Sequence, residues 1–187
     1  MTAALLIIDM QKAFFEDESL GNRQDRLVAA CNSAIAQARE AGISVYVIRT
    51  EHQRDKSTWT LSMLDDDQGF LFSGTEQAEP VDGLDIEGLP HMVKTRDSAF
   101  FGTDLLQRLR NLSVDTIVLA GVATHNCVAQ TAADAYANNV RVVYAKDAIA
   151  STNEEYAENV LGVLMDEYRQ QALGADAVRR LFSERAA

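Results

Sequence analysis

The sequence Thr116-Ile-Val-Leu-Ala-Gly-Val-Ala-Thr-His-Asn-Cys127-Val joins an apolar run to a helical pattern. The run 116–120 predicts a buried strand, Gly121 ends it, and a helix is expected from Thr124. Cys127 then falls in the first turn of that helix, at the carboxyl end of a strand. Backbone N–H groups and the positive end of the helix dipole favour a thiolate there, so Cys127 is a candidate nucleophile. The alternative is a small buried apolar residue, because free cysteines are often buried.

Apolar runs alternate with helical patterns on both sides of this stretch. Continuous apolar strands that alternate with helices are typical of a parallel sheet covered on both faces, so the sequence predicts an α/β fold. The expected strands are residues 4–10, 43–49, 91–94, 116–120, 140–145 and a short one near 171–173. The expected helices are residues 23–41, 104–111, 124–138, 153–166 and 175–183.

Length, composition and charge limit the class of protein. The chain has 187 residues, of which 47% are hydrophobic, and this fits one domain over residues 1–187. The net charge of -11 argues against nucleic acid or an anionic membrane as a partner, because both require a basic face.

The cysteines and the apolar runs indicate the compartment. Cys31 and Cys127 form no Cys-x-x-Cys pair and no disulfide framework, which favours a reducing environment. The apolar run 3–8 is short and has no basic leader, so a signal peptide is not expected. No segment approaches the roughly 20 apolar residues of a membrane span. We therefore expect a cytoplasmic protein.

Residues 51–88 form a long irregular segment in which Trp59, Phe70 and Phe72 stand among acidic residues and glycines. Structureless segments of this length are either functional loops or disordered. Aromatic side chains favour burial, so the segment is expected to be a lid or an oligomer contact rather than a disordered loop.

Three residues suited to chemistry stand at the ends of predicted strands. Asp9 ends the first strand, Lys94 ends the third, and Cys127 follows the fourth. Ligands of open parallel sheets bind beyond the carboxyl ends of the strands, so these side chains are expected at one sheet edge. The alternative is a buried Asp–Lys ion pair with an unrelated thiol, because buried charges need partners.

These residues lie in stretches that resemble the isochorismatase-like cysteine hydrolases, which include nicotinamidases and N-carbamoylsarcosine amidase. The matching stretches are Leu6-Ile-Ile-Asp9-Met-Gln11-Lys-Ala-Phe14, Val93-Lys94-Thr-Arg-Asp-Ser98-Ala-Phe100-Phe-Gly-Thr103, Gly121-Val-Ala-Thr124-His-Asn-Cys127-Val128 and Val143-Tyr-Ala-Lys-Asp147-Ala148. The resemblance covers nearly the whole chain. It implies a Rossmann-like, three-layer α/β/α fold with a mostly parallel six-stranded sheet in the order 3-2-1-4-5-6.

The resemblance also implies an Asp–Lys–Cys triad, which maps to Asp9, Lys94 and Cys127. Cys127 would attack an amide or carbamoyl carbon and form an acyl-enzyme, while Asp9 would accept and later return a proton. Lys94 would stabilise the charge of Asp9, although its strand would lie roughly 10 Å from the first strand, so its side chain must lean in. The oxyanion hole implied by the family consists of the backbone N–H groups of Ala123 and Cys127, beside a cis peptide bond between Val122 and Ala123.

The remaining candidate site residues are expected to bind substrate. Phe14 and Trp59 could line an apolar pocket, and Gln11 could orient Asp9 or a polar group of the substrate. His125 is a pocket candidate or, alternatively, a surface residue at a helix start. Cys31 lies on the apolar stripe of the first long helix and is expected to be unreactive core.

The sequence departs from that of the metal-binding nicotinamidases in the family it resembles. Those proteins carry an Asp-x-His segment after the second strand. This chain has Glu51-His52 there, and two ligands rarely make a metal site, so we expect no metal and no cofactor. Three functions remain open. They are metal-independent hydrolysis of a small amide or carbamoyl compound, isochorismatase-type hydrolysis of a vinyl ether, and a non-enzymatic binding role. Relatives commonly form oligomers, so a homodimer or homotetramer is expected.

Overall fold

The computed structural model describes residues 2–186. Its sheet has six strands, all parallel, in the order β3-β2-β1-β4-β5-β6. The strands are β1 Thr2–Ile8, β2 Ser44–Thr50, β3 His91–Lys94, β4 Val114–Gly121, β5 Arg141–Ile149 and β6 Gln171–Leu173. The predicted sheet order and α/β class are therefore confirmed.

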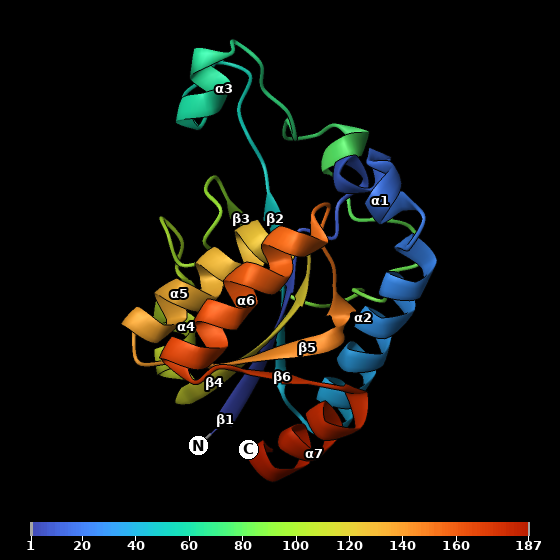
Figure 1. The fold of residues 1–187 in the computed structure, drawn as a ribbon, viewed down its shortest axis with the longest axis vertical. Coiled ribbons are helices and arrows are strands. Elements are labelled where there is room, and N and C mark those ends of the chain that lie inside the picture. Colours follow the sequence, from blue (N-terminus) through green and yellow to red (C-terminus); the bar gives the residue numbers. More distant parts are fainter. Residues whose placement is uncertain (1, 187) are drawn as a thin grey trace.

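Helices cover both faces of the sheet, which gives three layers (Figure 1). On one face lie α2 Gln24–Glu40 and α7 Ala175–Arg185, and on the other lie α4 Leu105–Asn111, α5 Ala129–Ala137 and α6 Glu154–Tyr168. Short elements follow the strand ends: η1 Lys12–Glu16, α1 Glu18–Gly21, α3 Leu61–Asp65, η2 Glu76–Ala78 and the π-helical turn η3 Thr124–Val128. Within residues 2–186, no helix is both long enough and apolar enough to cross a membrane.

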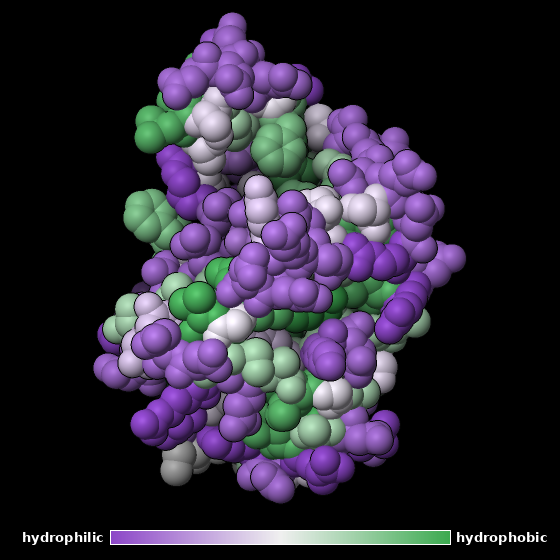
Figure 2. Space-filling view, viewed as in Figure 1, coloured by the Kyte–Doolittle hydropathy of each residue, from purple (hydrophilic) through white to green (hydrophobic). Residues whose placement is uncertain are grey.

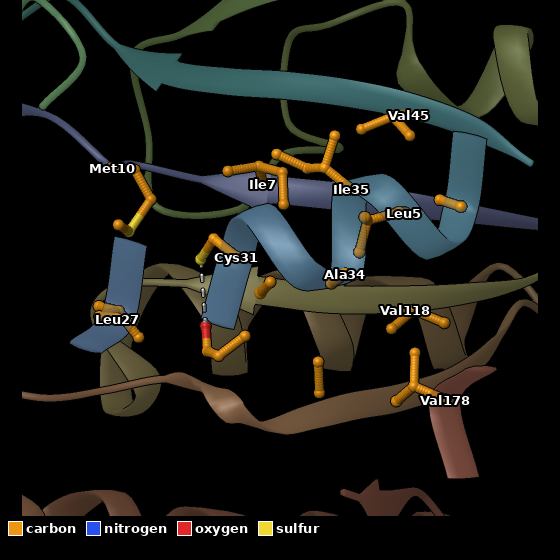
Figure 3. Close-up of a cluster of buried hydrophobic side chains, with 14 of the residues drawn as sticks. Leu5, Ile7, Met10, Leu27, Cys31, Ala34, Ile35, Val45, Val118 and Val178 are labelled. Carbon is orange, nitrogen blue, oxygen red and sulfur yellow. Dashed lines mark hydrogen bonds between the residues drawn. The ribbon is translucent and has the colours of Figure 1, made fainter. Parts of the chain in front are cut away.

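Strand β1 is the centre of the core because it is buried on both sides. Its side chains alternate between the two layers, as the twofold period of a strand requires. Leu5 and Ile7 pack toward α2, where Cys31 and Ile35 meet them (Figure 3). The Cys31 thiol contacts the carbonyl oxygen of Ala148 at 3.7 Å, and burial raises the pKa of Cys31 to about 12. Cys31 is therefore a neutral core residue.

Strand β5 extends four residues beyond its predicted end at Ala145. Its apolar run stops there, since Lys146 and Asp147 are exposed, and the hydropathy pattern therefore misses the continuation. Ile149 pairs with Gly121 of β4 after a shift in register. The end of β5 is thus held beside the end of β4, close to the turn that carries Cys127.

Residues 51–88 contain two short helical elements instead of one structureless loop. The bridge between His52 and Phe72 closes part of the segment, and Trp59 is buried with only 7% of its surface exposed. Helix α3 projects beyond the carboxyl ends of the strands (Figure 1). Seen from the same side, hydrophilic side chains cover most of the surface, with apolar ones visible between them across the middle (Figure 2).

Gly121 allows β4 to end in close contact with β1. Its φ of +110° lies in a region that favours glycine, and an added Cβ would lie 1.9 Å from the carbonyl oxygen of Ile8. Because that neighbour is backbone, no side-chain rotation could relieve the clash. Gly121 therefore permits the ends of β1 and β4, which precede Asp9 and Cys127, to approach each other closely.

We expect Gly121→Ala to reduce the free energy of unfolding by about 2–4 kcal/mol, because the backbone of β1 or β4 must move. Gly162→Ala is the matched control, since no atom lies within 4 Å of the added Cβ in α6. That change should stabilise the protein by about 0.5–1 kcal/mol through helix propensity. Urea unfolding of both variants measures the difference, and equal stabilities would contradict this account of Gly121.

Candidate active site

Asp9 is the first residue after β1 and lies fully buried at the carboxyl edge of the sheet. Its backbone has a φ of 51°, and its N–H donates to the carbonyl oxygen of Ile48 at 2.8 Å. The Oδ2 atom lies 2.8 Å from Nζ of Lys94, and Oδ1 accepts a hydrogen bond from the Thr50 hydroxyl at 3.0 Å. The carboxylate is thus held by one cation and one hydroxyl.

Lys94 ends β3, two strands away from β1, and its side chain reaches across the end of β2. Besides the contact with Asp9, Nζ donates to Thr50 Oγ1 at 2.6 Å and to Cys127 Sγ at 3.3 Å. Burial lowers the pKa of Lys94, but the negative charge of Asp9 and the sulfur of Cys127 outweigh it, and the pKa is raised. Lys94 is therefore a buried ammonium group that joins Asp9 to Cys127.

Thr50, which the sequence analysis did not single out, stands between the two charged residues. It ends β2 and pairs in register with Lys94 of β3. Its hydroxyl donates to Asp9 and accepts from Lys94, so it has a partner on each side. The predicted sheet order could have identified Thr50, because the end of β2 must lie between the ends of β1 and β3.

The side chain of Gln11 contacts the backbone of Thr50 and forms no hydrogen bond to the Asp9 carboxylate, although the Gln11 N–H donates to the carbonyl oxygen of Asp9 at 2.8 Å. Its amide nitrogen donates to the carbonyl oxygens of Thr50 and Ala78 at 2.9 and 2.8 Å, and its oxygen accepts from the N–H of Thr50 at 2.8 Å. Gln11 is fully buried. It therefore fixes the end of β2, and through Thr50 it positions Asp9 and Lys94.

Cys127 lies in η3, with 7% of its surface exposed. Burial and the negative charge of Asp9 raise the pKa of the Cys127 thiol well above its usual range, and Lys94 opposes this only in part. The direction of this pKa shift is opposite to the effect expected from the helix start alone. Burial and the carboxylate on the neighbouring strand both raise the thiol pKa, and neither is visible in the local helix pattern.

The turn before Cys127 contains the cis peptide bond between Val122 and Ala123 that the resemblance implied. The hydroxyl and the N–H of Thr124 both donate to the carbonyl oxygen of Ala150, at 3.0 and 2.9 Å. The end of β5 thus anchors the start of η3.

Aromatic side chains from two segments meet near this edge of the sheet. Phe14 and Phe70 pack edge to face with ring centroids 6.3 Å apart, and His52 lies 6.2 Å from Phe70. Nδ1 of His52 is 2.9 Å from the carbonyl oxygen of Thr58. Burial lowers the pKa of His52, which favours a neutral imidazole. These three rings form a mainly apolar group that includes the predicted residue Phe14.

The other two predicted substrate residues make contacts elsewhere. Trp59 packs on Phe72 and donates from Nε1 to the carbonyl oxygen of Gln53 at 2.8 Å, so it belongs to the interior of the 51–88 segment. His125 is half-buried, hydrogen bonds to Ser151 and packs against Tyr156 of α6. These contacts do not place the ring of Trp59 or of His125 against the Asp9–Lys94–Cys127 cluster.

The residues after β2 do not fit a metal site. The Glu51 carboxylate pairs with Arg49 at 3.0 Å, and Nδ1 of His52 is engaged by Thr58. Residues 2–186 contain no group of three or more His, Cys, Asp or Glu side chains arranged to hold a metal ion.

Comparisons with known proteins agree with this fold. The isochorismatase domain family matches residues 3–174, so the chain belongs to the isochorismatase family of hydrolases. It is 37% identical to a probable inactive nicotinamidase of Arabidopsis thaliana over 84% of this chain and 86% of that protein.

Two solved structures extend the comparison. An isochorismatase family protein from Desulfovibrio vulgaris is 31% identical, with a TM-score of 0.84 over 97% of this chain and 98% of its own. N-carbamoylsarcosine amidase from Thermoplasma acidophilum is 25% identical, with a TM-score of 0.79 over 94% and 98%.

Thr50→Val should lower the free energy of unfolding by about 1–3 kcal/mol, because Asp9 and Lys94 each lose a buried hydrogen-bond partner. Thr50→Ser retains the hydroxyl and serves as the control for that loss. Denaturant unfolding of the three proteins at neutral pH measures the effect. If the valine variant were as stable as the serine variant, the hydroxyl would not support the ion pair.

Proposed function

We propose that the protein hydrolyses a small amide or carbamoyl compound without a metal, through Cys127 as nucleophile. The observation that carries this proposal is the buried cluster in which Lys94 lies 2.8 Å from Asp9 and 3.3 Å from the Cys127 sulfur. A base, a cation and a thiol in mutual contact are the groups that nucleophilic acyl transfer requires.

The first half-reaction begins from the neutral thiol. As Sγ of Cys127 attacks the carbonyl carbon, the thiol proton passes to Asp9. Within residues 2–186, Oδ2 of Asp9 has the ion pair with Lys94 and no hydrogen bond of regular geometry, so a lone pair remains for this proton. Lys94 stabilises the developing negative charge on sulfur. Asp9 then returns the proton to the leaving nitrogen, the C–N bond breaks, and ammonia or an amine departs.

The second half-reaction releases the acyl group. Water attacks the thioester and Asp9 takes one of its protons. As the C–S bond breaks, Asp9 passes that proton to the Cys127 sulfur, which gives a carboxylic acid, the free thiol and the Asp9 carboxylate. A carbamoyl substrate follows the same steps to a carbamic acid. The N–H groups of Ala123 and Cys127 are proposed to stabilise the oxyanion in both halves.

The contacts of the nearby arginines favour an amide substrate over the vinyl ether isochorismate, which carries two carboxylates. Arg49 pairs with Glu51 at 3.0 Å and with Glu79 at 3.7 Å. Arg54 lies over the Phe72 ring, 4.4 Å from its centroid. Arg96 donates to the carbonyl oxygen of Thr58 at 2.8 Å. Each of these guanidinium groups is engaged by protein groups, which leaves less capacity to bind a dianion.

The binding-only hypothesis gains some weight from the relative described as a probable inactive nicotinamidase. This chain retains all three side chains of the proposed triad in contact, which favours an enzyme.

A homodimer or homotetramer also remains a proposal. Exposed apolar side chains support it, since Leu61 and Phe101 have 79% and 64% of their surface exposed.

Ammonia release from a panel of small primary amides and carbamoyl compounds tests the proposed reaction. We expect activity that survives a chelator and is lost in Cys127→Ala, while Cys31→Ala retains it because Cys31 lies in the core on the α2 side of the sheet. If isochorismate were cleaved and no amide were, the vinyl-ether function would replace this proposal.

Asp9→Asn should abolish hydrolysis, with a loss of about 10²–10⁴-fold for a general acid–base residue. The same change should speed the alkylation of Cys127 by iodoacetamide at neutral pH, because the charge of Asp9 is one cause of the raised thiol pKa. Mass spectrometry after timed labelling measures the rate. Slower alkylation in this variant would contradict the expectation and show that proton acceptance by Asp9 outweighs the effect of its charge on the thiol pKa.

A further inference from the structure

A carboxylate that the proposed mechanism does not use lies beside the sulfur of Cys127. Asp97 follows β3, is exposed, and has its Oδ1 atom 4.0 Å from Sγ. The same side chain lines a cavity of about 370 Å³ together with Thr60, Arg96, Ser98, Phe101, Gln130 and Asp134. Asp97 therefore connects this cavity to the nucleophile.

The charges around the cavity leave Asp97 without a local counterion. Its carboxylate forms no ion pair with a Lys or Arg of residues 2–186. Arg96, the cation of this cavity, donates to the backbone carbonyls of Thr58 and Trp59 at 2.8 and 3.3 Å. Lys94 is paired with Asp9 at 2.8 Å. Asp97 thus places a negative charge next to the reacting sulfur.

We propose that Asp97 makes the Cys127 site select compounds that carry a protonated amine and disfavour anionic ones. This inference rests on the proposed function and narrows its substrate class to small cationic amides or carbamoyl compounds. A carbonyl carbon in position for attack lies about 3 Å from sulfur. A charge-assisted hydrogen bond to Asp97, about 2.8 Å long, then suits an amine two or three bonds from that carbon. β-Alaninamide has this form, and butyramide is its neutral analogue.

Thiol reagents of opposite charge test the selectivity without any turnover. The probes are 2-aminoethyl and 2-sulfonatoethyl methanethiosulfonate, which react with the thiolate to form a mixed disulfide and release methanesulfinate. The protein is used as the Cys31→Ala variant, so that only Cys127 is labelled. Because the ratio of the two rates is compared, a changed thiol pKa affects both reagents alike and cancels.

We expect Asp97→Asn to lower the cation-to-anion rate ratio by about tenfold at moderate salt. Asp134→Asn removes a charge of the same sign from the same cavity. Asp134 lies seven residues after Cys127, and therefore roughly 10 Å from it at the rise of a helix. That control should change the ratio by less than about twofold. An equal ratio in wild type and Asp97→Asn, or equal effects of the two variants, would overturn the inference.

Ammonia release then separates this inference from the proposed function. Wild-type kcat/KM should be about tenfold higher for β-alaninamide than for butyramide, and Asp97→Asn should remove that preference. Hydrolysis of both amides without a preference would overturn the role of Asp97 and leave the amidase proposal standing. Charge-selective labelling with no hydrolysis of any amide would support the role of Asp97 and overturn the amidase proposal.

Discussion

The ion pair between Asp9 and Lys94 is the interaction on which the rest of the site depends. Both side chains are buried from solvent, and removing two charges from water costs several kcal/mol unless further hydrogen bonds satisfy them. Thr50 supplies those bonds from the intervening strand, and Gln11 holds Thr50 by its backbone. The ends of β1, β2 and β3 are therefore fixed relative to one another by the requirement that no buried charge be left unpartnered.

The fourth strand brings the thiol to this pair through backbone geometry. Gly121 lets β4 end against Ile8, the residue before Asp9, and the end of β5 holds the turn that follows. Cys127 thus meets a carboxylate and an ammonium group that are already in place. Burial and the negative charge of Asp9 raise the pKa of the thiol, and under the proposed mechanism the same carboxylate would accept the thiol proton during attack.

Much of this arrangement could be predicted from the sequence. Strand–helix alternation gave the fold class, and the positions of Asp9, Lys94 and Cys127 at strand ends gave three candidate residues of the site. Thr50 was not identified, because a threonine at a strand end carries no distinctive pattern. Gln11 was a candidate, but its contact with the backbone of Thr50 has no signature in the sequence. The raised pKa of Cys127 could not be predicted from its place at a helix start, since it depends on burial and on Asp9, which lies far away in sequence. The sequence also predicts that Lys94 must lean in, and the structure adds that its side chain crosses the end of β2 and contacts Thr50 on the way to Asp9.

The position of Cys31 has a consequence for the response of this protein to oxidants. Cys31 packs among side chains on the α2 face of the sheet, and Cys127 packs on the opposite face. Both thiols are free, and the sheet stands between them. A sulfenic acid formed on Cys127 would therefore have no second thiol within reach to convert it to an intramolecular disulfide. Reduction of that sulfenic acid would then depend on a thiol from outside the chain.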